Sequence, residues 1–208
     1  PGPGHRLFYL VLWPEDQIAG APDPVSWIDP LMRHQRLDYR ISLLRAAAHH
    51  GSTHQAAMVF QVIAPRQMRD FEIGRHRLQF LYQKPTAFER VNQLEYLDQI
   101  KSETGFANVA GVELTLLDCT RYFHKAGGLG GLAQITKDLG EKLNKRVLAK
   151  TAAAYENASV CRLGYVLESV GHERKADALL SFARKAKTAV RLNPSSKYLG
   201  SLPEQYER

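Results

Sequence analysis

The sequence has few cysteines, no long apolar run and no recognisable leader, and each absence excludes a class of protein. Its two cysteines, Cys119 and Cys161, are too few for a disulfide framework, and neither stands in a C-x-x-C metal pattern. The longest apolar run, Leu7 to Trp13, is far shorter than the roughly 18 residues of a membrane-spanning helix. No basic segment leads into an apolar stretch with a small-residue cleavage site, as in a signal peptide. We therefore expect a cytoplasmic protein without membrane contact.

The residues that are present are typical of a globular protein. The chain has 208 residues, of which 44% are hydrophobic and 24% are charged. This is enough apolar material for a sizeable core, arranged as one large domain or two small ones. The sequence starts with Pro1-Gly2-Pro3-Gly4 rather than with Met, so we expect it to be part of a longer polypeptide.

The net charge of +7 is unevenly distributed along the chain. Counting Lys and Arg against Asp and Glu, residues 1–60 are neutral and residues 91–124 are acidic, whereas residues 61–90 and 125–208 carry the basic excess. Basic excess of this kind favours an anionic partner such as nucleic acid. The alternative is a solvated basic face with no partner, because charged side chains lie outside in any case.

Apolar patterns along the chain predict both strands and helices. Predicted strands lie at 7–12, 59–63, 71–75, 78–82 and 190–192, and the third and fourth form a hairpin that turns near Gly74. Apolar residues at helical spacing predict helices that start near Pro24 and near Asp38, a helix at 88–100, and helices over 114–122, 132–147, 160–170 and 176–183. Asp38 is the expected N-cap of the second helix, and Gly51 is expected to end it.

These elements predict an α+β fold. We expect a small mixed or antiparallel sheet with helices in the N-terminal half, followed by a helical C-terminal half. The predicted organisation is a strand and linker at 1–24, an α/β region at 25–125 and a helical region at 126–208 that packs on it. The last two regions are alternatively one continuous domain over 25–192.

Few residue patterns support catalysis or metal binding. His50 and His54 have the spacing of two metal ligands on a helix, but Gly51 between them favours a helix end at which they and His49 pack. Glu72, Glu113 and Asp118 are the acidic residues available to a metal-dependent nuclease. No G-x-S-x-G elbow or P-loop is present, so we assign no catalytic, metal or cofactor residue.

Two short segments have a functional and a structural interpretation. The glycines of residues 127–131 precede a predicted helix, as in a phosphate-binding loop, but they follow a helix and lack the Lys-Ser/Thr pair. A tight turn between two helices is favoured. Residues 47–53 are similar to the turn of a helix-turn-helix, but a strand rather than a second helix is predicted after them. This favours a core helix that a glycine ends.

Basic side chains are the best candidates for binding. Arg75 and Arg77 stand two residues apart and are expected to share one face of a strand, where guanidinium groups suit phosphates. The candidate residues for nucleic-acid or partner binding are Arg66, Arg69, Arg75, Arg77, Lys142, Lys145, Arg146, Arg184, Lys185 and Lys187.

Several phrases, in this order and spacing, carry a resemblance to a known family. They are PVSWIDPLM at 24–32, YRISLLRAAAHHGSTH at 39–54, VFQV at 59–62, GRHRLQF at 74–80, Thr104-Gly105, VELTLLDCTRY at 112–122, AGGL at 126–129 and RLGYVLE at 162–168. Over roughly residues 20–190 the chain resembles the AbiEi antitoxins of type IV toxin–antitoxin systems, named for abortive phage infection. The residues matched have the character of structural positions: Gly51, Gly74, Asp118, Gly127, Gly128 and Gly164.

The resemblance implies two activities and no enzyme. One is counteracting a cognate AbiEii-type nucleotidyltransferase toxin, and the other is repressing the shared operon by binding promoter DNA. Family members place a winged helix-turn-helix before a larger C-terminal domain. We expect this chain to contain the C-terminal domain, with residues 7–12 as a remnant of the preceding segment. The rival hypotheses are a metal-dependent nuclease or other nucleic-acid enzyme, and a pure protein-interaction domain.

Overall fold

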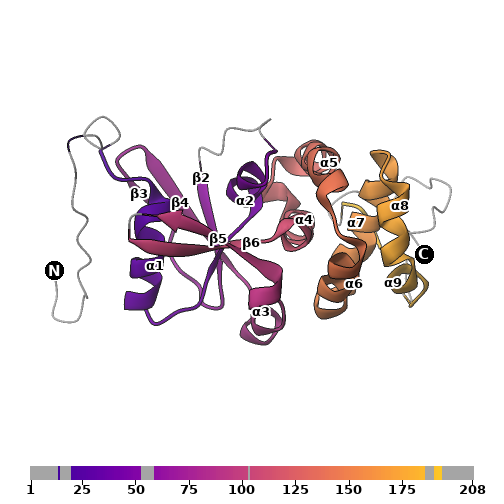
Figure 1. Cartoon of the computed structure of the whole chain (residues 1–208), viewed down its shortest axis with the longest axis horizontal. Coiled ribbons are helices and arrows are strands. Elements are labelled where there is room, and N and C mark those ends of the chain that lie inside the picture. The colour runs from indigo at the N-terminus through magenta and orange to yellow at the C-terminus, as the bar shows by residue number, and fades with distance from the viewer. Residues whose placement is uncertain (1–13, 15–19, 53–58, 103, 186–189, 194–208) are drawn as a thin grey trace.

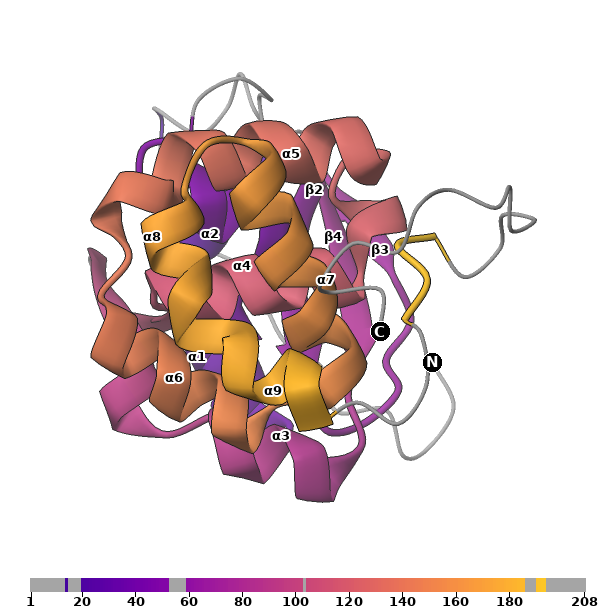
Figure 2. The ribbon, with the colours of Figure 1, turned by 90° about the vertical axis from the view of Figure 1, so that its right-hand side faces the viewer.

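The computed structural model describes residues 14, 20–52, 59–102, 104–185 and 190–193 (Figure 1). Helix α1 lies on one side of a sheet, and α2 and α4 lie on the other side. Helices α5 to α9 follow beyond α4 and form the far end of the molecule, which faces the viewer in Figure 2. The order of layers is therefore helix, sheet, helix pair and helical end.

The elements follow one another closely along the chain. The first half contains α1 (Pro24–His34), β1 (Arg40–Ile41), α2 (Leu43–His49), β2 (Val59–Ala64), β3 (Phe71–Ile73), β4 (His76–Tyr82), α3 (Pro85–Val91), β5 (Leu97–Ser102) and β6 (Gly105–Ala110). The second contains α4 (Val112–Arg121), α5 (Gly128–Leu139), α6 (Lys145–Ala154), α7 (Asn157–Ser169), α8 (Glu173–Ala176) and α9 (Leu180–Lys185). Short 3-10 turns η2 (Leu94–Tyr96), η3 (Phe123–Lys125), η4 (Gly140–Lys142) and η5 (Asp177–Leu179) connect them.

The strands of the described residues form one mixed sheet in the order β3-β4-β2-β1-β6-β5. The pairs β2–β4 and β1–β6 are parallel, and the other three pairs are antiparallel. The predicted α+β class is confirmed. The predicted hairpin is confirmed as well, with Glu72 opposite Arg77 and the turn at Gly74.

Helix α1 begins where the sequence indicates. The Asp23 carboxylate accepts a hydrogen bond from the Val25 amide at 2.9 Å, which satisfies an otherwise unpaired N–H, and Pro24 has the fixed φ that suits a first turn. The predicted apolar face, Trp27, Ile28, Leu31 and Met32, is buried against the sheet.

The second predicted helix begins later than expected, and the N-cap prediction for Asp38 is wrong. Residues 40–41 form β1, the short strand between β2 and β6, and α2 starts only after Ser42. The apolar spacing from Leu37 to Ala48 was misleading, because a two-residue strand is too short to disturb a helical pattern. The predicted end is confirmed: Gly51 adopts φ 98°, which few other residues tolerate.

The predicted helix at 88–100 is wrong over most of its length. Helix α3 ends at Val91, and the hairpin of β5 and β6 occupies 97–110. The β5 strand is at a sheet edge and only half-buried, so its side chains show no strong alternation of apolar and polar residues.

Two C-terminal predictions also need correction. The stripe over 132–147 is two helices, because α5 ends at Leu139 and Asn144 caps α6 through bonds from the amides of Arg146 and Val147. Residues 190–192 form no strand. The predicted strand at 7–12 lies outside the described residues. No described helix is long and apolar enough to cross a membrane.

Helix α4 is the centre of the molecule. Its residues 113–120 are all buried, because α2 packs on one side of it and α5, α6 and α7 pack on others. A helix that is buried all round needs apolar or fully paired side chains on every face. The apolar core extends without interruption from Val25 in α1 to Ala183 in α9.

Gly140 provides a test of packing at the helical end. A Cβ at this position would overlap with Cδ2 of His172, and that ring is held by contacts with the Lys137 carbonyl at 3.1 Å and the Glu141 carboxylate at 3.4 Å. We expect Gly140→Ala to lower the free energy of unfolding by about 1–3 kcal/mol in urea titrations. The added cost should vanish in a His172→Ala background.

The matched control is Gly130→Ala, because a Cβ there meets no atom within 4 Å. We expect it to be neutral or stabilising by up to about 1 kcal/mol, since alanine favours helix. An equal loss of stability in both alanine variants would contradict the packing argument.

Candidate functional site: a buried ion pair and exposed basic residues

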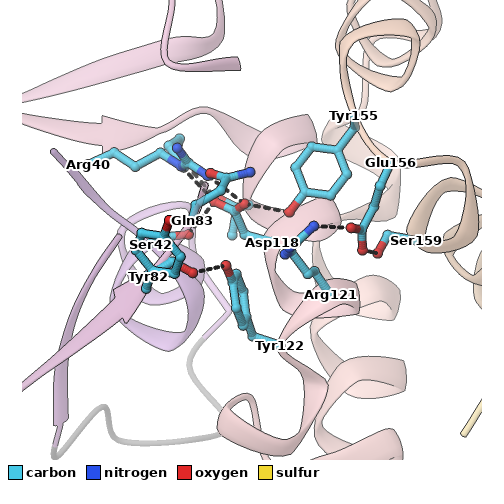
Figure 3. Close-up of polar contacts among 12 residues, drawn as sticks. Arg40, Ser42, Tyr82, Gln83, Asp118, Arg121, Tyr122, Tyr155, Glu156 and Ser159 are labelled. Atoms are coloured by element: carbon cyan, nitrogen blue, oxygen red, sulfur yellow. Dashed lines mark hydrogen bonds and ion pairs between the residues drawn. The ribbon is translucent and has the colours of Figure 1, made fainter. Parts of the chain in front are cut away.

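A buried ion pair joins the sheet to α4. Arg40 of β1 and Asp118 of α4 are both fully buried, and they bond side-on, with Nε to Oδ2 and Nη2 to Oδ1 each at 2.8 Å (Figure 3). A planar guanidinium and a carboxylate match in this geometry. The pair lies between the central strand and the central helix, so it fixes their relative position.

Neighbouring side chains add hydrogen bonds to this pair, and within the described residues only Nη1 of the Arg40 guanidinium is left without one. Ser42 donates to Oδ2 of Asp118 at 2.7 Å, Tyr155 donates to Oδ1 at 2.8 Å, and Gln83 accepts from Nη2 of Arg40 at 2.7 Å. The Arg40 guanidinium carbon also lies 5.2 Å from the centre of the Phe88 ring. Each carboxylate oxygen of Asp118 therefore accepts two hydrogen bonds.

Burial and charge act on this network in opposite directions. Burial lowers the pKa of Arg40, but the Asp118 charge and its hydrogen bonds outweigh burial, so the net shift is upward. Burial raises the pKa of Tyr155 well above its ordinary value, and the Asp118 charge raises it further. Tyr155 is therefore a neutral donor and Arg40 a cation, which is the arrangement that best compensates a buried carboxylate.

The three acidic residues that the sequence suggested as ligands of a nuclease metal have other contacts in the structure. Asp118 has its oxygens occupied, the Glu113 carboxylate accepts from the Asn144 amide at 2.7 Å, and Glu72 lies on the edge strand β3 beside Arg77. Within the described ranges, no three His, Cys, Asp or Glu side chains are placed to hold a metal ion. Cys119 is buried, and burial raises the pKa of its thiol.

The histidines end α2 as the packing interpretation predicted. His50 Nε2 lies 2.7 Å from the Ala110 carbonyl oxygen, and the His49 ring is 5.0 Å from that of His50. Burial lowers the pKa of His49, and the proximity of His50 lowers it further. His54 lies outside the described residues.

The glycines at 127–131 connect helical segments, as predicted. Gly127 adopts φ 82° between η3 and α5, and no strand precedes it. Gly130 and Gly131 lie inside α5 rather than in the turn, which the sequence did not indicate. Residues 59–64 form the strand β2, as expected, and residues 53–58 before it lie outside the described residues.

The four predicted arginines of the hairpin region do not form one cluster. Arg66 and Arg69 follow the end of β2, and Arg66 donates to Gln35 at 3.1 Å. Arg75 lies in the turn that follows β3, whereas Arg69 precedes this strand. The prediction that Arg75 lies on a strand is therefore wrong. Arg77 lies in β4, 3.8 Å from Glu72. All four are exposed, but they belong to two ends of the hairpin.

The C-terminal basic residues divide by what they contact. Lys142 donates from Nζ to the His50 carbonyl, so it caps α2, and Lys145 lies 3.9 Å from Asp177. Arg146, Arg184 and Lys185 are exposed and have no acidic partner within the described part of the chain. Lys187 lies outside the described residues.

Sequence reasoning missed Arg40, Gln83 and Tyr155 as members of a buried network. They lie 37, 43 or 78 residues from their partners along the chain, so no local spacing connects them. It also missed Tyr82, a large side chain that is 44% exposed. The only indication of this exposed ring in the sequence was the position of Tyr82 at the end of a predicted strand.

Comparisons with known proteins add a family and a fold. Residues 40–169 match the family of the AbiEi antitoxin C-terminal domain. The crystal structure of the RV2827C protein from Mycobacterium tuberculosis is similar, with a TM-score of 0.60 and 16% identity over 89% of this chain and 67% of that one. That likeness concerns the fold alone. No curated protein sequence matches the chain.

The hydroxyl of Tyr155 provides a test of the network. We expect Tyr155→Phe to lower the free energy of unfolding by about 1.5–3 kcal/mol, because it removes a buried hydrogen bond to a charged group. Tyr122→Phe is the matched control, since its hydroxyl bonds at the same 2.8 Å to the neutral Tyr82 carbonyl in a more exposed place. Urea titrations of both variants measure the difference, and a larger loss in Tyr122→Phe would contradict the assignment.

Proposed function

The chain belongs to the AbiEi antitoxin family, and from this premise we propose that it counteracts the nucleotidyltransferase toxin of a type IV toxin–antitoxin system. The family match carries this proposal: it begins at Arg40 and includes Asp118 and Tyr155, so it covers the buried network that organises the fold. The two free, buried cysteines agree with action in a reducing cytoplasm.

We propose that the protein acts by binding and not by catalysis. The acidic side chains best suited to metal chemistry, Asp118 and Glu113, serve as hydrogen-bond acceptors inside the fold. Among the exposed charged side chains of the described residues, lysines and arginines outnumber aspartates and glutamates. Such cations suit contacts with an anionic partner. An AbiEii-type toxin is the functional partner that the family premise implies.

We further propose that the full-length protein represses its own operon, using a winged helix for sequence choice and the helical end for phosphate contacts. Arg146 at the start of α6 and Arg184 and Lys185 at the end of α9 are exposed cations on this end of the molecule (Figure 2). Such contacts add affinity without selecting bases. Lys145 and Lys187 are further candidates, whereas Lys142 is engaged as a helix cap.

Co-expression tests the antitoxin role. We expect the protein to restore the growth of cells that express the toxin encoded beside it. Gly130→Ala should restore growth as well, because the change leaves the fold intact, whereas Asp118→Ala should fail because it leaves Arg40 buried without its carboxylate. Failure of both this chain and its full-length parent to restore growth would refute the role.

Promoter binding against salt tests the helical end. For the full-length protein, we expect Arg146→Gln to weaken promoter binding and to reduce the slope of log K on log salt by about 0.9, the value for one lost phosphate contact. Lys101→Gln, an exposed cation on β5, is the matched control and should leave the slope unchanged. Equal slopes for the two variants would remove the helical end from the DNA interface, and salt-insensitive partner binding without DNA affinity would favour a pure protein-interaction domain.

A further inference from the structure

The rim where β2 and β4 end brings together side chains that the sequence separates. Ala64 and Tyr82, the last residues of these strands, lie opposite each other. Arg66 and Lys84 follow two residues later on the two strands, and the Gln83 amide donates to the Ala64 carbonyl at 3.1 Å.

The end of α4 adds a third cation to this rim, and the residue that follows the helix adds a second tyrosine. The Tyr122 hydroxyl donates to the Tyr82 carbonyl oxygen at 2.8 Å (Figure 3). The guanidinium carbon of Arg121 lies 5.4 Å from the centre of the Tyr122 ring. We call the set Arg66, Tyr82, Lys84, Arg121 and Tyr122 the rim surface.

The rim surface has more positive than negative charge, and three of its five residues are exposed, whereas Arg121 and Tyr122 are half-buried. Tyr82 is 44% exposed, and Arg66 and Lys84 are both exposed. Of the nearby carboxylates, Glu156 is bound to Arg121, and Asp70 accepts from the Phe80 amide at 2.9 Å. A third carboxylate, Asp38, is exposed in the segment that leads into β1, and the same segment carries the exposed cation Arg36.

We propose that the rim surface binds single-stranded nucleic acid. An exposed aromatic ring flanked by cations is the combination that such ligands require, because bases stack on the ring while phosphates pair with the cations. The ring of Tyr82 would stack an unpaired base, and Arg66 and Lys84, two residues beyond the ends of β2 and β4, would contact the backbone. The proposal does not rest on the antitoxin function or on promoter binding.

A duplex fits this surface less well than a single strand. The bases of a duplex are stacked on each other, so their faces are not available to Tyr82. Arg66 follows the end of β2, and Lys84 is the N-cap of α3, so these cations belong to the segments after two strands and not to an exposed helix face that could enter a major groove. Stacking tolerates any base, so we expect binding without strong sequence preference.

Fluorescence anisotropy with labelled oligonucleotides tests the proposal. We would measure oligouridine and oligothymidine of about 12 nucleotides, within the site sizes known for single-strand binders, against the whole chain at low salt. For whichever of the two oligonucleotides binds the native chain, we expect Tyr82→Ala to weaken the affinity by about 5- to 150-fold. Tyr82→Phe should keep the native affinity, because the aromatic ring remains. Lys84→Gln should reduce the slope on log salt by about 0.7.

Two controls separate stacking from general effects. Phe106→Ala removes an aromatic ring that is 53% exposed on β6, three strands away from β4, and it should bind as the native chain does. A duplex of the same length should bind Tyr82→Ala and the native chain equally. Absence of single-strand binding, unchanged binding by Tyr82→Ala, or an equal loss in Phe106→Ala or with the duplex would overturn the proposal.

Discussion

The ion pair of Arg40 and Asp118 is the interaction on which the rest of this structure depends. Two full charges lie in the interior, and such charges are tolerated only when each is paired and hydrogen-bonded. Four elements supply the partners: β1 provides Arg40, α4 provides Asp118, the end of β4 leads to Gln83, and the end of α6 leads to Tyr155. The sheet, the central helix and the helical end must therefore be in place together.

This constraint explains why the buried acidic residues have a structural role. Asp118 and Glu113 are the acidic residues that first suggest metal chemistry, but each accepts hydrogen bonds that hold one element against another. The surface is different in character, because cations at the helical end, and cations with Tyr82 at the rim, are exposed. Membership of the AbiEi antitoxin family agrees with a protein whose interior serves stability and whose surface serves recognition.

Local sequence predicted those elements whose signal is complete within one segment. Helix α1 has its cap, its proline and its apolar face within 11 residues, and the hairpin of β3 and β4 has its glycine turn between two apolar runs. The elements that were missed depend on partners elsewhere. Strand β1 exists because β2 and β6 pair with it. The apolar stripe that starts at Leu132 gives no sign of the break between α5 and α6, because both helices bury the same kind of side chain.

The sequence by itself determined the fold class, the uneven placement of basic charge and the resemblance to an antitoxin family, because these follow from composition, periodicity and the order of short phrases. Only the tertiary structure decided what single side chains do. It placed Asp118 opposite Arg40 across 78 residues of chain, made Lys142 a helix cap, and brought Tyr82 and Tyr122 together at one rim. Charge and burial act through distance in space, and distance in space between remote segments is set by packing and not by spacing along the chain.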